Sequence, residues 1–164
     1  MLRARLDLLQ QMPVFGAIRE DALQSLLERA GTMQIAAGDF FFREQDQASS
    51  MFVLEVGQVA VAKGWQGRDF LLNRLHAGDC FGEMALMDLQ PRSASVRAEA
   101  DCRAIEFGTG DLLRLFERDV EQFALVQMNL GREVCRRLRA TDDLIFRVRM
   151  GEQLPELRPL PLTA

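Results

Sequence analysis

FVLEVGQVAV, residues 52–61, alternates apolar positions on both sides of a glycine and predicts two β-strands joined by a tight turn at Gly57. Further short runs rich in β-branched and aromatic residues occupy residues 33–107, with glycine or polar clusters between them. A second hairpin is expected to turn within residues 64–67. Many short strands at this spacing predict an antiparallel sandwich or jelly roll.

Helical sequence flanks the β-rich region on both sides. Apolar residues recur at helical spacing over residues 22–30. Residues 111–117 predict a short helix, and residues 120–148 predict a long one without proline. We therefore predict an α+β fold for residues 1–150: an antiparallel β jelly roll with an N-terminal helix and a long C-terminal helix.

The C-terminal part of the chain has two further features. Residues 151–164 hold three of the five prolines and are expected to form an extended tail. Along the long helix, apolar spacing alternates by four and three, as in a coiled coil, and this pattern fits either a dimer seam or a helix packed on its own domain. The residues of this seam are Val134, Leu138, Thr141, Ile145 and Val148.

The composition is that of an ordinary globular domain. The chain has 164 residues, of which 48% are hydrophobic and 27% charged, which excludes a disordered chain. The longest uncharged run, residues 8–18, falls short of the roughly 20 residues that a membrane span needs. The net charge of 20 − 24 = −4 argues against a surface that binds polyanions. We expect a soluble, cytoplasmic protein.

Few residues are available for catalysis. His76 is the single histidine, and the chain contains no tyrosine, no P-loop and no GxGxxG between a strand and a helix. Metal-dependent β-barrel enzymes need several converging histidines. The cysteines, Cys80, Cys102 and Cys135, are spaced too widely for a zinc module or a disulfide framework. We expect no enzymatic activity, no cofactor and no metal.

The most informative segment is FGEMALMDLQPRSASV, residues 81–96. Gly82 allows a close backbone approach, and the start of a short helix at residues 83–87 offers free N–H groups to an anion. Arg92 adds a planar fork of donors that suits a phosphate. Glu83 would repel a phosphate and is better suited to a hydroxyl, such as that of a sugar. An anion, a hydroxyl and a surrounding apolar barrel describe a nucleotide.

This segment resembles the phosphate-binding cassette of the cyclic-nucleotide-binding domain family, which includes the catabolite activator and the regulatory subunits of protein kinase A. The family signature is FGE-[LM]-A-L followed by PR-[AST]-A-[ST]-V, and the resemblance covers about residues 10–150. It implies that Glu83 binds the ribose 2′-hydroxyl and that Arg92 pairs with the cyclic phosphate. It also implies that the phosphate shell is completed by Gly82, Met84, Ala85 and Ser93. An internal Glu83–Arg92 salt bridge is the alternative interpretation.

The resemblance also implies contacts to the base and sugar. Val61 and Leu72 are expected against them, although both fit an ordinary core as well. Thr141 and Asp142 correspond to base-contacting positions, or else form a polar stripe on a solvated helix. Thr141 lies on the apolar seam, and Asp142 is about 100° away around the helix. We therefore expect Thr141 to contact the base and cyclic AMP to bind in preference to cyclic GMP, whereas Asp142 in the pocket would favour guanine.

The resulting hypothesis is a regulatory sensor that binds a cyclic nucleotide and transmits the signal through its C-terminal helix, with a homodimer possible through that helix. No helix-turn-helix follows Leu144, so a stand-alone domain that does not bind DNA is expected. Two alternatives are a catabolite-activator-type transcription regulator without its DNA-binding domain and an interaction domain that no longer binds nucleotides. Residues 43–46, REQD, lack the glycine that many family members carry there, so this turn is expected to be altered.

Overall fold

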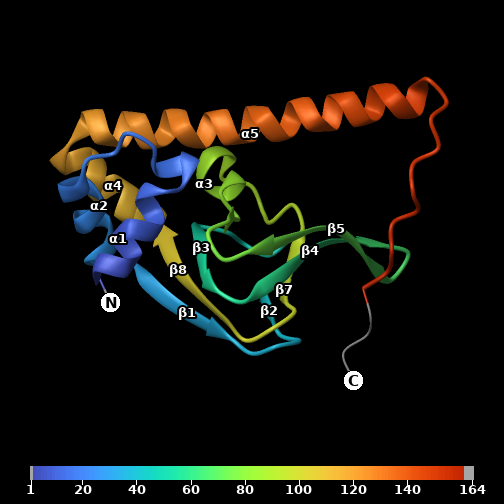
Figure 1. Cartoon of the computed structure of the whole chain (residues 1–164), viewed down its shortest axis with the longest axis horizontal. Coiled ribbons are helices and arrows are strands. Elements are labelled where there is room, and N and C mark those ends of the chain that lie inside the picture. The colour runs from blue at the N-terminus through green and yellow to red at the C-terminus, as the bar shows by residue number, and fades with distance from the viewer. Residues whose placement is uncertain (1, 161–164) are drawn as a thin grey trace.

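The computed structural model describes residues 2–160, and Figure 1 shows the arrangement of its elements. The helices are α1 (Leu2–Gln10), the short 3₁₀ helix η1 (Pro13–Phe15), α2 (Glu20–Leu27), α3 (Met84–Asp88), α4 (Thr109–Arg118) and α5 (Val120–Arg149). The strands are β1 (Gly31–Ile35), β2 (Phe40–Phe42), β3 (Ser50–Val56), β4 (Gln58–Trp65), β5 (Arg68–His76), β6 (Cys80–Phe81), β7 (Ser95–Ala98) and β8 (Cys102–Gly108).

The strands form two four-stranded antiparallel sheets, in the orders β1-β8-β3-β6 and β2-β7-β4-β5. A cluster of phenylalanine rings lies between them, in which Phe41 contacts Phe52 and Phe81 with ring centroids 5.6 and 5.0 Å apart. Edge-to-face contacts of this kind add to the burial of the rings. The predicted antiparallel jelly roll, with helices at its N-terminal end and a long C-terminal helix, is therefore confirmed.

The predicted hairpin at Gly57 is wrong. β3 pairs with β6 and β8, whereas β4 pairs with β5 and β7, so Gly57 carries the chain from one sheet to the other. Alternating apolar residues show that two strands are adjacent in sequence but do not specify their partners. The second predicted hairpin is confirmed, because β4 and β5 pair around Gln66 and Gly67, whose φ angles of 48° and 77° suit a two-residue turn.

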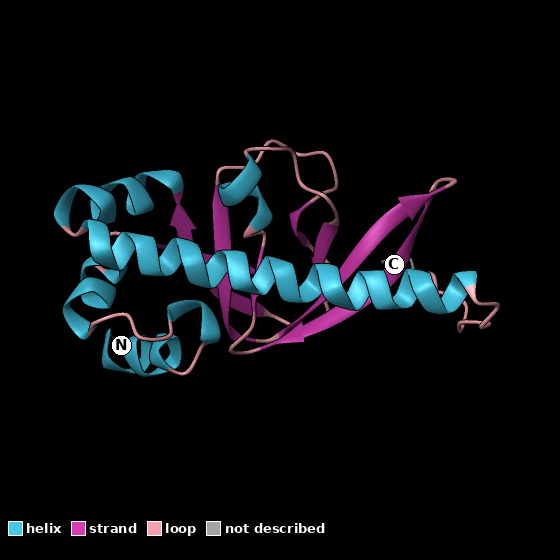
Figure 2. Ribbon diagram, turned by 90° about the horizontal axis from the view of Figure 1, so that it is seen from above, coloured by secondary structure: helices cyan, strands magenta, loops and turns pink. Residues whose placement is uncertain are grey.

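α1, α2 and α4 gather at one end of the roll, and α5 extends from them along the whole molecule (Figures 1 and 2). α1, which sequence periodicity did not single out, packs Leu6 and Leu9 into this helical core. Two side chains of α5 bind the N-terminal segment: the Gln122 carbonyl accepts from the Arg19 N–H at 2.7 Å, and the Asn129 amide donates to the Gly16 carbonyl at 2.8 Å. The first half of α5 is thereby fixed, whereas residues 135–149 are exposed.

The turn at residues 43–46, the tail and the absence of a membrane span were also expected from the sequence. The turn at residues 43–46 places Gln45 in the left-handed region, with φ 71°, a conformation that favours glycine. The tail beyond α5 is extended and returns to the roll, with residues 161–164 outside the described part of the chain. Within residues 2–160, no helix is long and apolar enough to cross a membrane.

Candidate functional site

Gly82 begins the site, where the chain leaves β6 and enters α3. Its φ is 77°, and a Cβ atom added there would lie 2.5 Å from Nη1 of Arg92. Only glycine therefore fits between the two segments of the cassette. α3 begins at Met84, so the N–H groups of Met84 and Ala85 lie in its first turn, where a helix offers them no acceptor of its own.

Arg92 is buried and held by backbone oxygens. Its Nη1 donates to the carbonyls of Ser50 at 2.7 Å and Gly82 at 3.0 Å, and Nη2 donates to the Ser50 hydroxyl at 3.3 Å. The guanidinium carbon lies 4.0 Å from the centroid of the Phe42 ring. Burial lowers the pKa of Arg92 from its usual value. Its Nε is buried without a hydrogen-bond partner among residues 2–160, so one donor of the guanidinium is unused.

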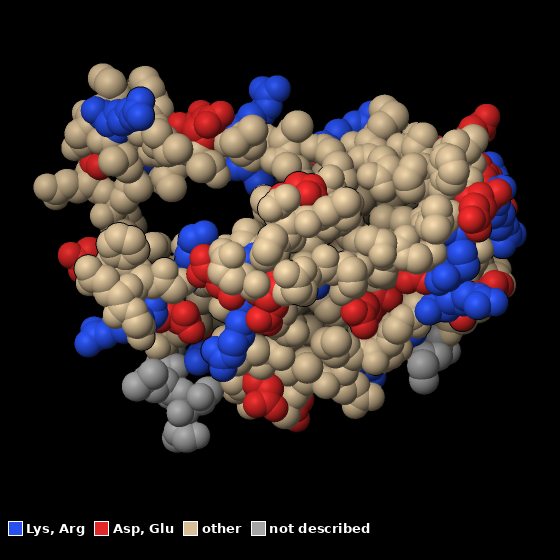
Figure 3. Space-filling model, turned by 180° about the vertical axis from the view of Figure 1, so that it is seen from behind, with Lys and Arg blue, Asp and Glu red and all other residues tan. Residues whose placement is uncertain are grey.

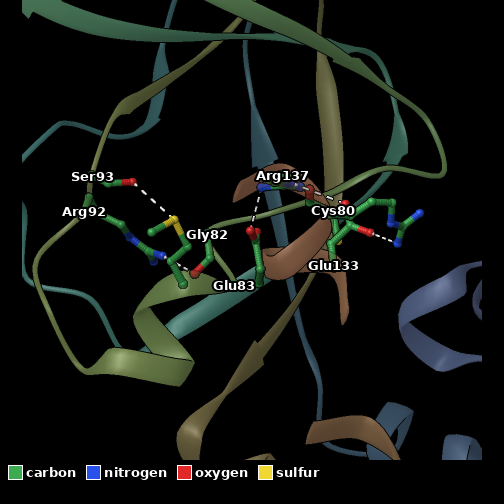
Figure 4. Close-up of polar contacts among 9 residues, drawn as sticks. Cys80, Gly82, Glu83, Arg92, Ser93, Glu133 and Arg137 are labelled. Atoms are coloured by element: carbon green, nitrogen blue, oxygen red, sulfur yellow. Dashed lines mark hydrogen bonds and ion pairs between the residues drawn. The ribbon is translucent and has the colours of Figure 1, made fainter. Parts of the chain in front are cut away.

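Glu83, at 1% exposure, is the most deeply buried charged residue of the cassette. Its Oε1 accepts from Nη1 of Arg137 at 2.5 Å (Figure 4). Its Oε2 is buried and has no hydrogen-bond partner within the described chain. An unpaired buried acceptor of this kind costs about 1–3 kcal/mol, so a hydroxyl brought by a ligand would be bound favourably here.

Arg137 is the residue of the site that sequence reasoning missed. It reaches Glu83 from α5 and also lies 3.3 Å from Oε1 of Glu133, which forms an ion pair with Arg136 as well. A signal for it was present, since Arg137 stands four residues before Thr141 and therefore on the same helical face. The sequence does not show that this face passes over the cassette.

The cassette opens into a cavity of about 690 Å³, within the range of small-molecule sites. It is bounded by β4 and β5, by the cassette and by α5. Asp142 is not among the residues that line it. Of the residues expected from the sequence, the cavity lining contains Val61, Leu72, Gly82, Glu83, Met84, Ala85, Arg92, Ser93 and Thr141.

Four of these side chains differ in how firmly they are placed. Ser93 lies with its hydroxyl 3.8 Å from the sulfur of Met84, at the rim of the cassette. Thr141 donates its hydroxyl proton to the carbonyl of Arg137 at 3.0 Å, which leaves the lone pairs of its oxygen as acceptors. Val61 is half-buried, whereas Leu72 is largely exposed at the cavity mouth.

The site offers little to a nucleophilic reaction. Burial, with the nearby charge of Glu83, raises the pKa of the Cys80 thiol to about 12, so this cysteine stays protonated. His76 lies at the end of β5, where its backbone N–H donates to the Asp79 carboxylate at 2.8 Å. No group of three or more histidine, cysteine, aspartate or glutamate residues between positions 2 and 160 is placed to hold a metal ion.

Comparison with known proteins agrees with this geometry. The family model of the cyclic nucleotide-binding domain matches residues 32–119. The chain is 27% identical over 107 residues to a cAMP-dependent protein kinase regulatory subunit of Emericella nidulans, covering 65% of this chain and 26% of that protein. It is 26% identical over 145 residues to the CRP-like cAMP-activated global transcriptional regulator of Mycobacterium tuberculosis, covering 85% of this chain and 63% of that protein.

The fold agrees as well. The catabolite activator protein of Thermus thermophilus matches with a TM-score of 0.75 and 27% identity, over 84% of this chain and 63% of that chain. The chain spans about a quarter of the length of the kinase regulatory subunits that it matches. With a family model that covers more than half of its residues, the chain belongs to the cyclic nucleotide-binding domain family.

Proposed function

We propose that the cavity binds cyclic AMP, without converting it, and that binding acts on α5 as a regulatory signal. One observation carries this proposal: Oε2 of Glu83 and Nε of Arg92, on the same cassette, are both buried without hydrogen-bond partners in the described part of the chain. A ribose hydroxyl would satisfy the first atom and a cyclic phosphate the second. Burial of an anion beside Arg92 is favourable because the guanidinium is already desolvated and fixed.

The preference for adenine rests on Thr141. Its hydroxyl proton is committed to the carbonyl of Arg137, so the oxygen can only accept. The 6-amino group of adenine donates to such an acceptor, whereas the 6-oxo group of guanine would face it with a second acceptor. Two apposed acceptors cost about 1–3 kcal/mol. Asp142, which would favour guanine, does not line the cavity.

The signal passes from the cassette to the long helix through the ion pair that joins them. Glu83 would bind the ligand hydroxyl through Oε2 while Oε1 accepts from Arg137. A ligand hydroxyl at Oε2 would therefore act on the position of the carboxylate that holds Arg137 of α5. Residues 135–149 of α5 are exposed, so little packing opposes their response. We also propose that the protein is located in the cytoplasm, as the sequence leads us to expect.

Titration calorimetry of the purified chain with cyclic AMP tests the site. Losing one partner of a buried charge pair costs about 2–5 kcal/mol, so Arg92→Ala is expected to weaken binding roughly thirty- to several-thousand-fold. Arg114→Ala, which removes an exposed arginine of α4, is the matched control and should bind as the parent does. Near-parental affinity in a folded Arg92→Ala variant would refute the phosphate assignment.

The sugar assignment has its own test. The parent should bind cyclic AMP more tightly than 2′-deoxy cyclic AMP. Glu83→Ala should weaken the binding of cyclic AMP by about 1–3 kcal/mol and abolish that preference. An unchanged preference in Glu83→Ala would show that the ribose hydroxyl binds elsewhere.

Paired titrations with cyclic AMP and cyclic GMP test the base. The parent and Asp142→Ala are expected to prefer cyclic AMP alike, and Thr141→Ala is expected to lose the preference. Cyclic GMP could bind the parent more than tenfold tighter than cyclic AMP, with the order of the two affinities reversed in Asp142→Ala. That result would show that Asp142 determines the base preference and that the assignment to Thr141 is wrong.

A homodimer through α5 is the second part of the proposal. The apolar seam residues Leu138, Ile145 and Val148 are all exposed on the single chain, a pattern typical of a helix that packs against a partner. Sedimentation should detect a dimer that Leu138→Glu dissociates. Ala140→Glu, which adds the same charge on a different face of the helix, should leave the dimer intact. A parent chain that sediments as a monomer at high concentration would exclude this seam as an interface.

A further inference from the structure

The segment after α5 returns to the roll and extends its sheet. The Leu71 N–H donates to the carbonyl of Arg158 at 2.9 Å, and the Leu160 N–H donates to the carbonyl of Asp69 at 2.8 Å. Phe70 and Pro159 face each other in an antiparallel bridge between these bonds. β5 is the last strand of the sheet β2-β7-β4-β5, so the tail covers an edge that would otherwise have unpaired backbone groups.

Leu160 anchors this attachment. It is 8% exposed and packs with Ala60 and Ala62 of β4 and with Leu71 of β5. Pro159 has no N–H, and it occupies the position of the added strand where none is required, as proline does at sheet edges. Leu157, three residues earlier, is 54% exposed. The contact is therefore specific to the last described residues and is not a general adhesion of the tail.

The tail leaves α5 by a defined turn. Gly151 has φ 90°, and the Arg147 side chain donates from Nε to Glu152 at 2.7 Å, which directs the chain away from the helix axis. From there the tail descends to the β4–β5 hairpin (Figure 1). The space-filling view shows an opening that is enclosed by α5, the tail and the roll (Figure 3). Beyond the residues that line the cavity, the distal part of α5 thus spans open space before the tail begins.

We propose that residues 158–160, here called the strap, hold the distal half of α5 over the mouth of the cavity. The first attachment of α5 is its packed first half together with the Arg137–Glu83 ion pair, and the second is the strap on β5. With the strap docked, the end of the helix is fixed relative to the β4–β5 hairpin. With the strap released, the exposed half moves about its buried base.

The size of the attachment makes such release reversible. Two backbone hydrogen bonds and one leucine side chain form a small unit at the edge of a sheet, and units of this kind open without unfolding of the core. The roll and the helical core have their own apolar clusters, which do not include Leu160. The strap is a conformational device beyond the nucleotide site, and it operates whether or not the cavity is occupied.

Spin-label distance measurements on the full chain test the strap. One label is placed at Trp65→Cys, near the tip of the β4–β5 hairpin, and the other at Met150→Cys, at the end of α5; Cys135→Ser removes the exposed native thiol. Labelled protein is diluted with unlabelled protein so that only distances within one chain are measured. Leu160→Asp breaks the anchor, truncation after Leu154 removes the strap, and Leu157→Asp places the same charge on an exposed tail position.

The parent and Leu157→Asp are expected to give one narrow distance distribution, and the truncated chain and Leu160→Asp a broad one. In parallel, the Leu71 amide should exchange its hydrogen at least tenfold faster in the truncated chain than in the parent. A parent whose Leu71 amide is already unprotected would overturn the proposal, because the strap would not be docked. A narrow, unshifted distribution in the truncated chain would overturn it as well, because α5 would then need no strap.

Discussion

Arg137 connects the long helix to the cassette through one carboxylate, and this contact is testable at the scale of single residues. Arg137→Ala leaves buried Glu83 without its protein donor, which is expected to lower the free energy of unfolding by about 1–3 kcal/mol. Urea denaturation measures the change. The control is Arg136→Ala, because Arg136 pairs only with partly exposed Glu133 among the described contacts. Equal losses in the two variants would contradict the role of the Glu83 contact.

Glu55 ties α1 to the roll and predicts a pH dependence of stability. Burial acts to raise its pKa, but Arg5, at 2.8 Å, and Arg103, at 3.2 Å, outweigh burial and hold the pKa of Glu55 below its usual value. The unfolded chain therefore binds a proton at higher pH than the folded chain. The stabilisation is present above the unfolded pKa of about 4.3 and is lost as the pH falls through the lower, folded pKa.

Urea midpoints measured between pH 3 and pH 7 check this expectation. This range includes the pKa of an unperturbed glutamate, about 4.3. The parent should lose stability toward acid, and Glu55→Gln should be less stable at neutral pH with a shallower acid limb. Parallel pH profiles of the two proteins would show that Glu55 contributes nothing to the acid response.

Gly57 belongs to the scale of elements, because it joins a strand of one sheet to a strand of the other. Its φ is 101°, and an added Cβ would lie 2.5 Å from Sγ of Cys102 and 2.7 Å from the carbonyl of Asp101. Gly57→Ala is therefore expected to destabilise the fold by at least about 2 kcal/mol, through both backbone strain and overlap. Thermal or urea unfolding measures the loss.

Gly67 supplies the matched control for this prediction. Its φ of 77° is also in the left-handed region, but an added Cβ meets nothing within 4 Å. Gly67→Ala should therefore carry only the backbone penalty, about 1 kcal/mol. If both substitutions cost the same, contact with the Asp101–Cys102 segment does not decide the path of the chain between the sheets.

At the scale of the whole molecule, ligand binding should stabilise the folded chain. A ligand at one hundred times its dissociation constant adds about 2.7 kcal/mol, which corresponds to a rise of roughly 5–10 °C in Tm for a domain of this size. Cyclic AMP is expected to produce this rise in a thermal unfolding experiment with the parent chain. Arg92→Ala should show none, and an unshifted parent at millimolar cyclic AMP would contradict nucleotide binding in this cavity.

Much of the architecture follows from local sequence patterns. Period-two alternation predicts strands such as β4 and β5, and the turn residues between them predict their hairpin. The long helix is predicted over residues 120–148 and observed over Val120–Arg149. The prediction of a hairpin at Gly57 is wrong because a half-buried strand has the same alternation of apolar and polar residues whichever sheet it joins. α1 was missed because its apolar residues are separated by Arg3, Arg5 and Asp7, which obscure the helical spacing.

The sequence by itself determined the fold class and the position of the cassette. Gly82, Glu83 and Arg92 lie within eleven residues of one another, so their proposed roles depend on local geometry that a short motif encodes. Only the tertiary structure decided that Arg137, 54 residues after Glu83, is its partner, that Asp142 lies off the cavity, and that Leu160 closes the edge of β5. These contacts depend on the direction in which α5 crosses the roll and on where the tail turns. Helical periodicity shows which residues share a face but not what that face meets, because the packing of one element on another is set by the whole core.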